Sequence, residues 1–454
     1  MWDETGTDVS ARVARLLLWV DTCPLRILAF ILVVAFFLAA PHFWVSPISL
    51  HAGETGNWWP IIDNVEDGRG YRGCFTSYFP FCGPANDATA AREPAPVLLF
   101  AGVARLTRDS FRAAALIQIL LNLAVTVGVF FLARELAKST RVALLAALLW
   151  ALYLPPNRTE IAQVTGNLLA TACVTGGVFL FLRARRTGRA HDWLIAGTCL
   201  GIGALSRSAL SVIPLVLALG SLVAILRTAH ISAAERLRSL GVVALFVLAF
   251  GIVLCPWLVR NYVAFGRLVL GSTLTGYDLY RENSLLPTEN YLHFVAGSEA
   301  DAAVASLLAR RTDLTGLETE AQMDTVYRDE ALRIIETYPL RYMMLSLARL
   351  PMLWFDWTVP EAYGYPRYLS DYVLWCQQVL LLLTAVVGIG SLRWRAWSLA
   401  ISVVAVTLLY MAVIGRLYLL IPVMPLVVTL GAIGCAHLWR KRHRIVSPLR
   451  MWSR

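Results

Sequence analysis

Charged residues are scarce in this sequence: they make up 15% of its 454 residues, against 58% hydrophobic residues. Because soluble domains usually carry about 25% charged residues, this composition excludes an ordinary soluble protein. Histidine is also rare, with seven residues, and no spacing among His, Asp and Glu repeats a metal-ligand pattern. We therefore predict no metal site and no required cofactor, and leave dependence on a divalent metal open.

The sequence is rich instead in long apolar runs. They lie at about 27–47, 112–133, 142–156, 162–182, 192–206, 209–227, 240–258, 371–391, 396–414 and 417–438. Most are long enough to cross a hydrocarbon core of about 30 Å as a helix. Backbone groups in lipid must bond to one another, which makes such spans helical. The predicted fold class is therefore an all-α membrane protein, a polytopic bundle of about ten transmembrane helices.

Acidic residues are outnumbered, and the net charge is +10. This excess does not indicate nucleic-acid binding, because the basic residues gather in short connections between the apolar runs. They are Arg134, Lys138 and Arg141; Arg183, Arg185, Arg186 and Arg189; Arg227, Arg236 and Arg238; Arg393 and Arg395; and Arg440, Lys441, Arg442 and Arg444. Every second connection is basic, so the positive-inside rule predicts that these loops and both termini are cytoplasmic. Contact with membrane lipids is expected throughout.

The two long connections fall on the opposite, outer side, at 48–111 and about 260–370. We divide the chain into an N-terminal transmembrane module (1–258) that contains the first outer loop, an outer-face segment (259–370), and C-terminal transmembrane helices with a basic tail (371–454). The periodicity of the middle part predicts a helix over 299–338. The apolar stretch 340–357 carries Arg341 and Arg349 and ends near Trp354 and Trp357, which predicts an amphipathic helix lying in the outer interface.

The first outer loop contains the most informative polar residues. Cys74 and Cys82 share it, in a compartment that permits a disulfide, and the sequence alone leaves open whether they are bridged. The other six cysteines lie in or beside apolar segments, where Cys packs as a small hydrophobe. Most of the loop's acids are typical of a solvated surface. Glu54 differs, because it follows the first span closely. Apolar neighbours such as Trp58 favour a carboxyl pKa that suits proton abstraction.

An ordered series of motifs along the chain resembles a known family. It consists of Glu54, Trp58, Asn64, Gly68, Gly70 and Tyr71; Arg92-Glu93-Pro94-Ala95-Pro96; Gly201 to Arg207; Pro256 to Arg267 with Ser272, Thr273, Gly276, Leu279 and Asn283; and Gly415-Arg416 with Pro422 and Pro425. This series is similar to that of bacterial relatives of the dolichyl-phosphate-mannose protein mannosyltransferases. These are polytopic glycosyltransferases of the type C fold, and lipid A aminoarabinose transferases are similar.

The resemblance implies a reaction and its residues. The family's first-loop acid is an Asp that acts as general base, and its position falls on Glu54 here. A second family acid at the start of the fourth span is replaced by Asn167, with Glu160 nearby as a substitute. Asp63 is a further catalytic candidate in the first loop. The implied substrates are a polyprenyl-phosphate sugar donor and a glycan, lipid or protein acceptor. The implied location is the outer face of a bacterial inner membrane.

An inverting displacement at a polyprenyl phosphate needs fixed cations for the leaving group, and the planar fork of arginine matches phosphate oxygens. We expect Arg92, Arg207, Arg260 and Arg416 to supply these cations, with Tyr262 helping to frame the donor. The alternative for each arginine is an interfacial side chain that only reaches the headgroups, and for Tyr262 a belt residue. Ionisable groups within membrane segments are costly and commonly functional, which favours the first interpretation.

Two other functions remain open. A lipid transporter or flippase could use the same arginines to escort a phosphate headgroup without any chemistry. Such proteins usually carry broken helices and half-sites at mid-membrane, whereas this sequence places its polar residues in the outer loops. A family member without catalytic activity is the other alternative, because Glu54 and Asn167 depart from the family pattern.

Overall fold

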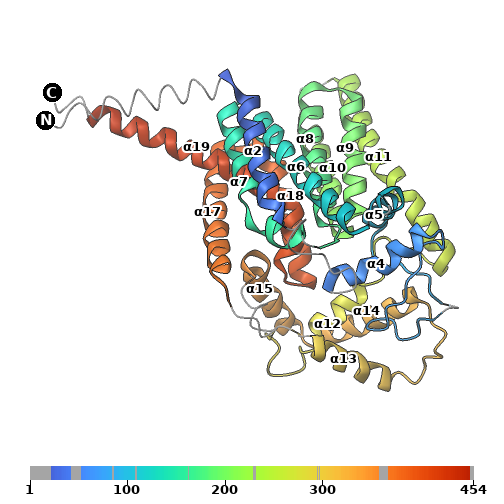
Figure 1. The fold of residues 1–454 in the computed structure, drawn as a ribbon. Coiled ribbons are helices and arrows are strands. Elements are labelled where there is room, and N and C mark those ends of the chain that lie inside the picture. The colour runs from blue at the N-terminus through green and yellow to red at the C-terminus, as the bar shows by residue number, and fades with distance from the viewer. Residues whose placement is uncertain are drawn as a thin grey trace.

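The computed structural model describes residues 22–41, 53–83, 86–107, 110–161, 163–228, 232–293, 295, 297–356 and 367–449. Within these ranges the side chains of 53–55, 110, 111, 158, 159 and 443–449 are not described. The described backbone is helical, and its one strand-type pairing is an isolated bridge between Arg72 and Ala88. Figure 1 shows a helical bundle with a group of further helices at its lower end.

Each of the ten predicted spans corresponds to a helix. They are α2 (Pro24–Ala39), α6 (Ser110–Ala137), α7 (Thr140–Ala151), α8 (Asn167–Thr187), α9 (Ala190–Ala204), α10 (Val212–Arg227), α11 (Ala233–Phe265), α17 (Leu369–Leu392), α18 (Trp397–Val413) and α19 (Met424–Leu449). The described chain holds six helical stretches long and apolar enough to cross a membrane, one of which contains both α17 and α18. Three shorter apolar helices add to these, so the protein is a multi-pass membrane protein.

Two of the expected spans begin with an irregular stretch. The fourth span was expected from 162, but the chain forms a π-helix over Pro156–Glu160 and α8 begins only at Asn167. The last span was expected as one helix from 417, but it opens with a 3-10 helix, η4 (Leu417–Val423), before α19. Both irregular stretches contain proline, which removes a backbone donor from the α-helical ladder. The 3-10 helix η4 lines the cavity described below, and the π-helix contains a residue that supports it.

The last helix lies at the centre of the bundle. The apolar window of the stretch Leu417–Arg442 is 89% buried, whereas that of α11 is 22% buried and largely faces outward. The helices α17 and α19 pack closely through glycine. A Cβ atom on Gly388 would meet the carbonyl oxygen of Leu430, and one on Gly434 would meet that of Thr384. Small residues permit such close approach between membrane helices, where lipid supplies no hydrophobic driving force.

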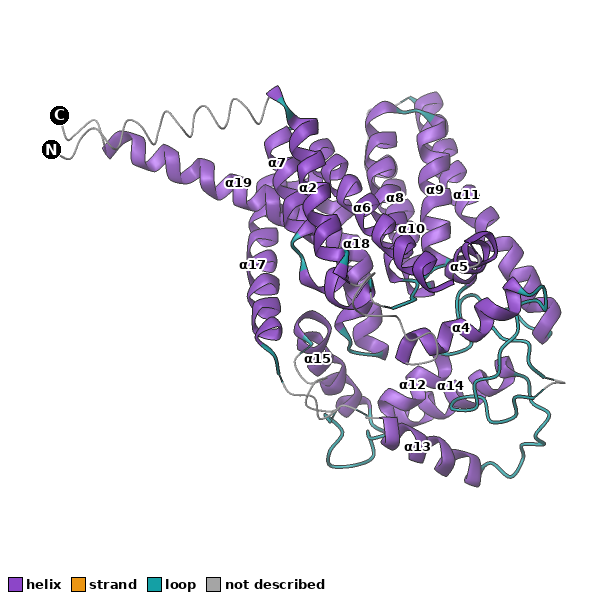
Figure 2. Ribbon diagram, viewed as in Figure 1, coloured by secondary structure: helices purple, strands orange, loops and turns teal. Residues whose placement is uncertain are grey.

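The two long connections expected on the outer side both contain helices. The first contains α4 (Gly53–Glu66) and α5 (Pro94–Thr107), which the sequence analysis treated as loop. The second contains α12 (Thr275–Asn283), α13 (Gly297–Arg310), α14 (Glu320–Thr337) and α15 (Pro339–Phe355). Figure 1 shows α4, α12, α13 and α14 gathered at one end of the bundle. Figure 2 shows that the longer connecting loops lie at that same end.

The helix expected over 299–338 is two helices, α13 and α14. The break is built by Gly316, whose positive φ of 81° suits glycine, and by Thr319, which caps α14 in a capping box with Gln322. The expected amphipathic helix at 340–357 is α15, although Trp357 lies outside the described residues. Its Arg349 is buried and donates hydrogen bonds to the carbonyl oxygens of Glu282 and Ala412, so this side chain joins helices and does not face headgroups.

The basic connections predict which end of the bundle is cytoplasmic. Figure 1 shows the α8–α9 connection at the end opposite α12 and α13. A green fluorescent protein fused after Arg186 in this connection is expected to be fluorescent, and alkaline phosphatase at the same position inactive. A matched pair of fusions after Thr288, between α12 and α13, should give the reverse result. Active phosphatase after Arg186 would overturn the predicted orientation.

Candidate active site

A cavity of about 660 Å³ lies between the outer helices and the bundle. Six parts of the chain meet there: α4, the segment around Tyr78, the segment around Arg92, the start of η2 (Ser208–Ser211), α12, and the junction of α18 with η4. We call it the arginine cavity. Its polar and aromatic lining consists of Asn57, Trp58, Ser77, Tyr78, Arg92, Glu93, Arg207, Ser208, Ser211, Ser272, Thr275, Tyr277, Asp278, Arg281, Tyr410, Arg416 and Tyr418.

Four guanidinium groups face the arginine cavity from different elements. Arg207 is oriented by a hydrogen bond from its Nε to Asn167 Oδ1 at 2.7 Å, and it lies over the ring of Tyr418. Arg92 lies over the ring of Trp58, at 5.6 Å from the ring centre. The remaining two, Arg281 and Arg416, share the buried carboxylate of Glu282, at 3.8 and 3.7 Å.

Two carboxylates line the arginine cavity and differ in their environment. Glu93 Oε1 accepts hydrogen bonds from the backbone N–H and the hydroxyl of Ser208, at 2.9 and 3.0 Å. Asp278 lies in the first turn of α12. Burial and the neighbouring charge of Glu282 raise the pKa of Asp278 to about 6, although Arg281 and other guanidinium groups oppose the shift.

Aromatic rings complete the lining. The rings of Tyr78 and Tyr277 lie 5.6 Å apart, and Trp58, Tyr410 and Tyr418 face the same space. Aromatic faces beside hydrogen-bonding groups suit a ligand that has both apolar and polar surfaces. The arginine cavity can therefore hold an anionic group among its guanidinium groups and a polar, ring-shaped group against its aromatic wall.

Three of the arginines expected from the sequence, Arg92, Arg207 and Arg416, are brought together in the arginine cavity. The fourth, Arg260, does not line it. Its guanidinium donates hydrogen bonds to the carbonyl oxygens of Thr89 and Tyr71, at 2.8 and 2.7 Å, and to Asn261 Oδ1 at 3.0 Å.

The most specific motif of the sequence, around Arg260, forms a structural junction where α11 ends. The indole of Trp257 donates to the carbonyl oxygen of Gly271, and the amide of Asn261 donates to that of Val269. Gly266 closes the helix in the left-handed conformation, with a φ of 67°. This junction ties the first outer segment to the start of the second. Tyr262, expected to frame the donor, is 57% exposed and does not line the arginine cavity.

The three expected catalytic acids occupy different places. Glu54 lies in the first turn of α4 and precedes the cavity residue Trp58 by four positions. Its side chain is not among those that the structure describes. Asp63 is on the same helix, partly exposed and outside the cavity lining. Glu160 is buried in the π-helix, where its Oε2 accepts a hydrogen bond from the hydroxyl of Thr165 at 2.6 Å.

Glu160 reaches the arginine cavity through a chain of hydrogen bonds. Its partner Thr165 accepts from the backbone N–H of Asn167 at 3.3 Å, and Asn167 Oδ1 in turn holds Arg207. The two positions linked above to a second family acid are Asn167 and Glu160. They therefore support Arg207 and do not form the cavity wall themselves. Both are buried and neither lines the cavity.

The glycine and tyrosine motif of the first outer segment shapes the path of the chain back from α4. Gly68 and Gly70 have positive φ values of 75° and 89°, which glycine adopts without strain. Asn64 donates to the carbonyl oxygen of Arg72, and the hydroxyl of Tyr71 donates to that of Arg92. This motif therefore fixes the segment that carries Arg92 into the arginine cavity.

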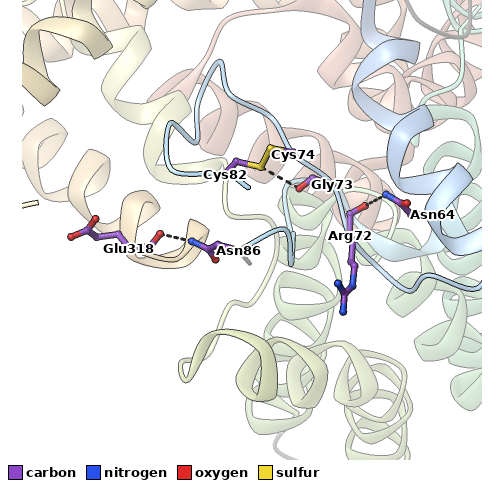
Figure 3. Close-up of a disulfide and its surroundings, with 7 residues drawn as sticks. All are labelled: Asn64, Arg72, Gly73, Cys74, Cys82, Asn86 and Glu318. Carbon is purple, nitrogen blue, oxygen red and sulfur yellow. Dashed lines mark hydrogen bonds between the residues drawn. A yellow bond between two sulfur atoms is a disulfide. The ribbon is translucent and has the colours of Figure 1, made fainter. Parts of the chain in front are cut away.

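A disulfide joins Cys74 and Cys82, whose Cα atoms are 5.4 Å apart, which answers the question that the sequence left open. Figure 3 shows it between two hydrogen-bonded anchors of the same segment, Asn64 with Arg72 and Asn86 with the carbonyl oxygen of Glu318. The closed ring contains Tyr78, which lines the arginine cavity. The disulfide thus restrains part of the cavity wall.

Three charged cavity residues were missed as site residues in the sequence: Glu93, Asp278 and Arg281. Glu93 stands inside the motif that ends with Pro96, so its position beside Arg92 was a usable signal. Asp278 and Arg281 are three residues apart, the spacing of one helical face, but nothing in the sequence indicates what that face meets. Among the described residues, no three or more His, Cys, Asp or Glu side chains form a group that could hold a metal ion.

Comparison with known proteins identifies the family that the chain resembles. Residues 91–257 match the family model described as dolichyl-phosphate-mannose-protein mannosyltransferase. This segment includes Arg92, Glu93 and Arg207, and the resemblance expected from the sequence is confirmed. No curated protein sequence matches the chain.

Solved structures show which fold the chain has. An oligosaccharyltransferase from Archaeoglobus fulgidus, tethered with an acceptor peptide, is 13% identical with a TM-score of 0.54, and the match covers 92% of this chain and 50% of that one. AglB from the same organism, with an inhibitory peptide and a dolichol-phosphate, is 16% identical with a TM-score of 0.53, covering 95% and 52%. The chain spans about half the length of these proteins.

A bacterial structure is similar over more of its own length. ArnT from Cupriavidus metallidurans, bound to undecaprenyl phosphate, is 12% identical with a TM-score of 0.40, covering 90% of this chain and 77% of that one. The predicted fold class is confirmed: the chain has the helical membrane architecture of the type C glycosyltransferases.

Proposed function

We propose that this protein is a membrane glycosyltransferase that moves a sugar from a polyprenyl-phosphate donor to a hydroxyl acceptor on the outer face of a bacterial inner membrane, with both termini in the cytoplasm. The observation that carries this proposal is the arginine cavity, where four guanidinium groups, two carboxylates and an aromatic wall meet at the end of the bundle that holds the outer helices. The match of residues 91–257 to a mannosyltransferase family supports the same reaction class.

The guanidinium groups would bind the carrier phosphate. Arg92, Arg207 and Arg416 were expected in this role from the sequence, and Arg281 joins them from α12. They outnumber the two carboxylates that line the cavity, so an anion is a favourable ligand there. A structurally similar protein binds dolichol-phosphate, which makes a polyprenyl phosphate the donor to test first. For Arg260 and Tyr262, which lie outside the cavity lining, we propose support of the loop and contact with lipid, respectively.

The chemical step is proposed as an inverting displacement. A hydroxyl oxygen of the acceptor forms a bond to the anomeric carbon, the bond from that carbon to the phosphate oxygen breaks, and the polyprenyl phosphate leaves. Glu54 would accept the hydroxyl proton, because it lies one helical turn before the cavity residue Trp58. Glu160 and Asn167 would act by holding Arg207 in place, and Asp63 remains a candidate on α4 that does not itself line the cavity.

Each of the three chain segments is proposed to supply part of the site. The module 1–258 would supply the base and two of the arginines, the segment 259–370 would supply Asp278 and Arg281, and the segment 371–454 would supply Arg416 together with the central helix. Every segment therefore contributes to one cavity. No single segment is expected to be active alone.

A transfer assay tests this proposal directly. Purified protein is incubated with a panel of radiolabelled polyprenyl-phosphate sugars and with membrane extracts that contain glycan, lipid and protein acceptors. We expect label to pass from at least one donor to an acceptor, and free polyprenyl phosphate to appear in equal amount. Protein that binds the donors and moves them across vesicles without cleaving them would show a flippase instead. A preparation with Arg207→Ala serves as the matched negative control.

A further inference from the structure

Asp278 is distinguished from the other carboxylates near the arginine cavity by its lack of partners. Its side chain lines the cavity, yet it accepts no hydrogen bond and forms no ion pair with any described residue. Glu93, by contrast, is held by Ser208, and Glu282 is paired with Arg281 and Arg416. The side chain is partly accessible from the cavity, so a bound ligand can contact it directly. Asp278 is therefore a group whose partner would be the ligand of the cavity.

The charged surroundings of Asp278 are those of an anion site. The titratable and charged groups around it are Tyr277, Arg281 and Glu282 on α12, Arg92 and Glu93 before α5, Arg207 before η2, Asp324 on α14, Tyr78 in the disulfide ring, Tyr410 on α18, Arg416 before η4, and Tyr418 on η4. Arg281, one helical turn from Asp278, shares its helical face. Arg281, Arg416 and Arg92 are the guanidinium groups that lower its pKa.

This position argues against Asp278 as the base of the transfer reaction. In an inverting displacement at a sugar, the base and the leaving group lie on opposite faces of the ring. Asp278 lies among the arginines that would bind the leaving phosphate, so it belongs to the phosphate side. An ionised carboxylate there would repel the phosphate. A protonated carboxyl group would instead donate a hydrogen bond to a phosphate oxygen.

We propose that Asp278 binds the carrier phosphate as a neutral carboxyl group, so that binding of the lipid donor takes up one proton. This inference rests on the proposed function, because it requires a phosphate in the arginine cavity. The proton comes from solvent when the lipid binds and returns to solvent when the lipid leaves. Burial and Glu282 already raise the pKa of Asp278, and the negative charge of a bound phosphate would raise it further.

The test measures lipid binding against pH with a probe that does not titrate. Farnesyl methyl phosphate is a phosphodiester with one negative charge from pH 5 to 9, like the proposed donor. For the full-length wild-type protein in detergent, we expect Kd to rise above pH 6 by up to about tenfold per pH unit and then to level off. Asp278→Asn and Asp278→Ala should each bind with a Kd that is constant over this range, and more tightly than the wild type at pH 8.

Two other acids, outside the cavity lining, have pKa values raised into the same range and serve to challenge the assignment. Burial raises the pKa of Glu320 to about 7 and that of Asp324 to about 6. Glu320 accepts from Ala90 N–H and the Thr273 hydroxyl, and Asp324 accepts from Gly276 N–H at 2.6 Å, so both are bonded within the protein. If both Asp278 variants keep the pH dependence of the wild type, the proton is taken up elsewhere and the proposal is wrong.

A second comparison separates this inference from the proposed function. Asp301→Asn changes an exposed acid on α13 outside the cavity and should keep the wild-type pH profile. Wild-type protein that fails to bind the phosphodiester at every pH would overturn both the lipid donor and the role of Asp278. Wild-type protein that binds the probe and transfers sugar, while the Asp278 variants follow its pH profile, would overturn the role of Asp278 alone.

Discussion

Glu54→Gln is expected to reduce sugar transfer by about 10²- to 10⁴-fold, the range that removal of a general base usually costs. Glutamine keeps the size of the side chain but cannot accept the proton of the incoming hydroxyl group. Binding of the lipid donor should stay within about twofold of the wild type, because the proposed phosphate ligands are arginines on other elements. The measurements are kcat for labelled-sugar transfer and Kd for the donor lipid.

Two further variants of α4 sharpen this test. Glu66→Gln makes the same chemical change on the same helix, at a position outside the cavity lining, and should leave kcat unchanged. Glu54→Asp shortens the side chain by one methylene and restores the residue type of the family, so measurable activity should remain. Wild-type turnover in Glu54→Gln would remove Glu54 as the base.

Arg207→Ala is expected to weaken donor binding by about 10- to 150-fold. A hydrogen bond to a charged group contributes about 1.5 to 3 kcal/mol, and each 1.4 kcal/mol corresponds to a factor of ten. Arg207 is oriented toward the cavity by Asn167 and lies over Tyr418, so its fork is preorganised for an anion. Arg207→Lys keeps the charge but loses the fork, and an intermediate loss is expected. The measurement is Kd for the lipid donor.

The controls for this prediction are two other arginines. Arg267→Ala removes an exposed side chain that bonds to Thr325 outside the cavity, and it should bind the donor normally. Arg260→Ala removes three hydrogen bonds from the junction after α11, so we expect it to lower the thermal unfolding midpoint together with donor affinity. Donor binding by Arg207→Ala at the wild-type level would show that the phosphate does not bind in the arginine cavity.

The sequence was informative about the site where motifs and membrane chemistry coincide. Arg92, Arg207 and Arg416 were expected as phosphate ligands, and all three line one cavity although more than 300 positions separate the first from the last. Arg260, in the most specific motif, lies outside the cavity lining. Its hydrogen bonds go to carbonyl oxygens of the first outer segment, because a guanidinium group can tie two segments together as well as bind a ligand.

The sequence alone determined the membrane character, the helical spans and the sidedness predicted from the basic connections, because span length and charge placement are local properties of the chain. Only the tertiary structure decided which polar groups face one cavity and which are hydrogen-bonded to other groups of the protein. Asp278 and Arg281 entered the site on α12, and Glu93 entered it beside Ser208, to which it is hydrogen-bonded. Asp278 emerged as the cavity carboxylate without a described partner. Such pairings depend on helices far apart in sequence, and no local pattern encodes them.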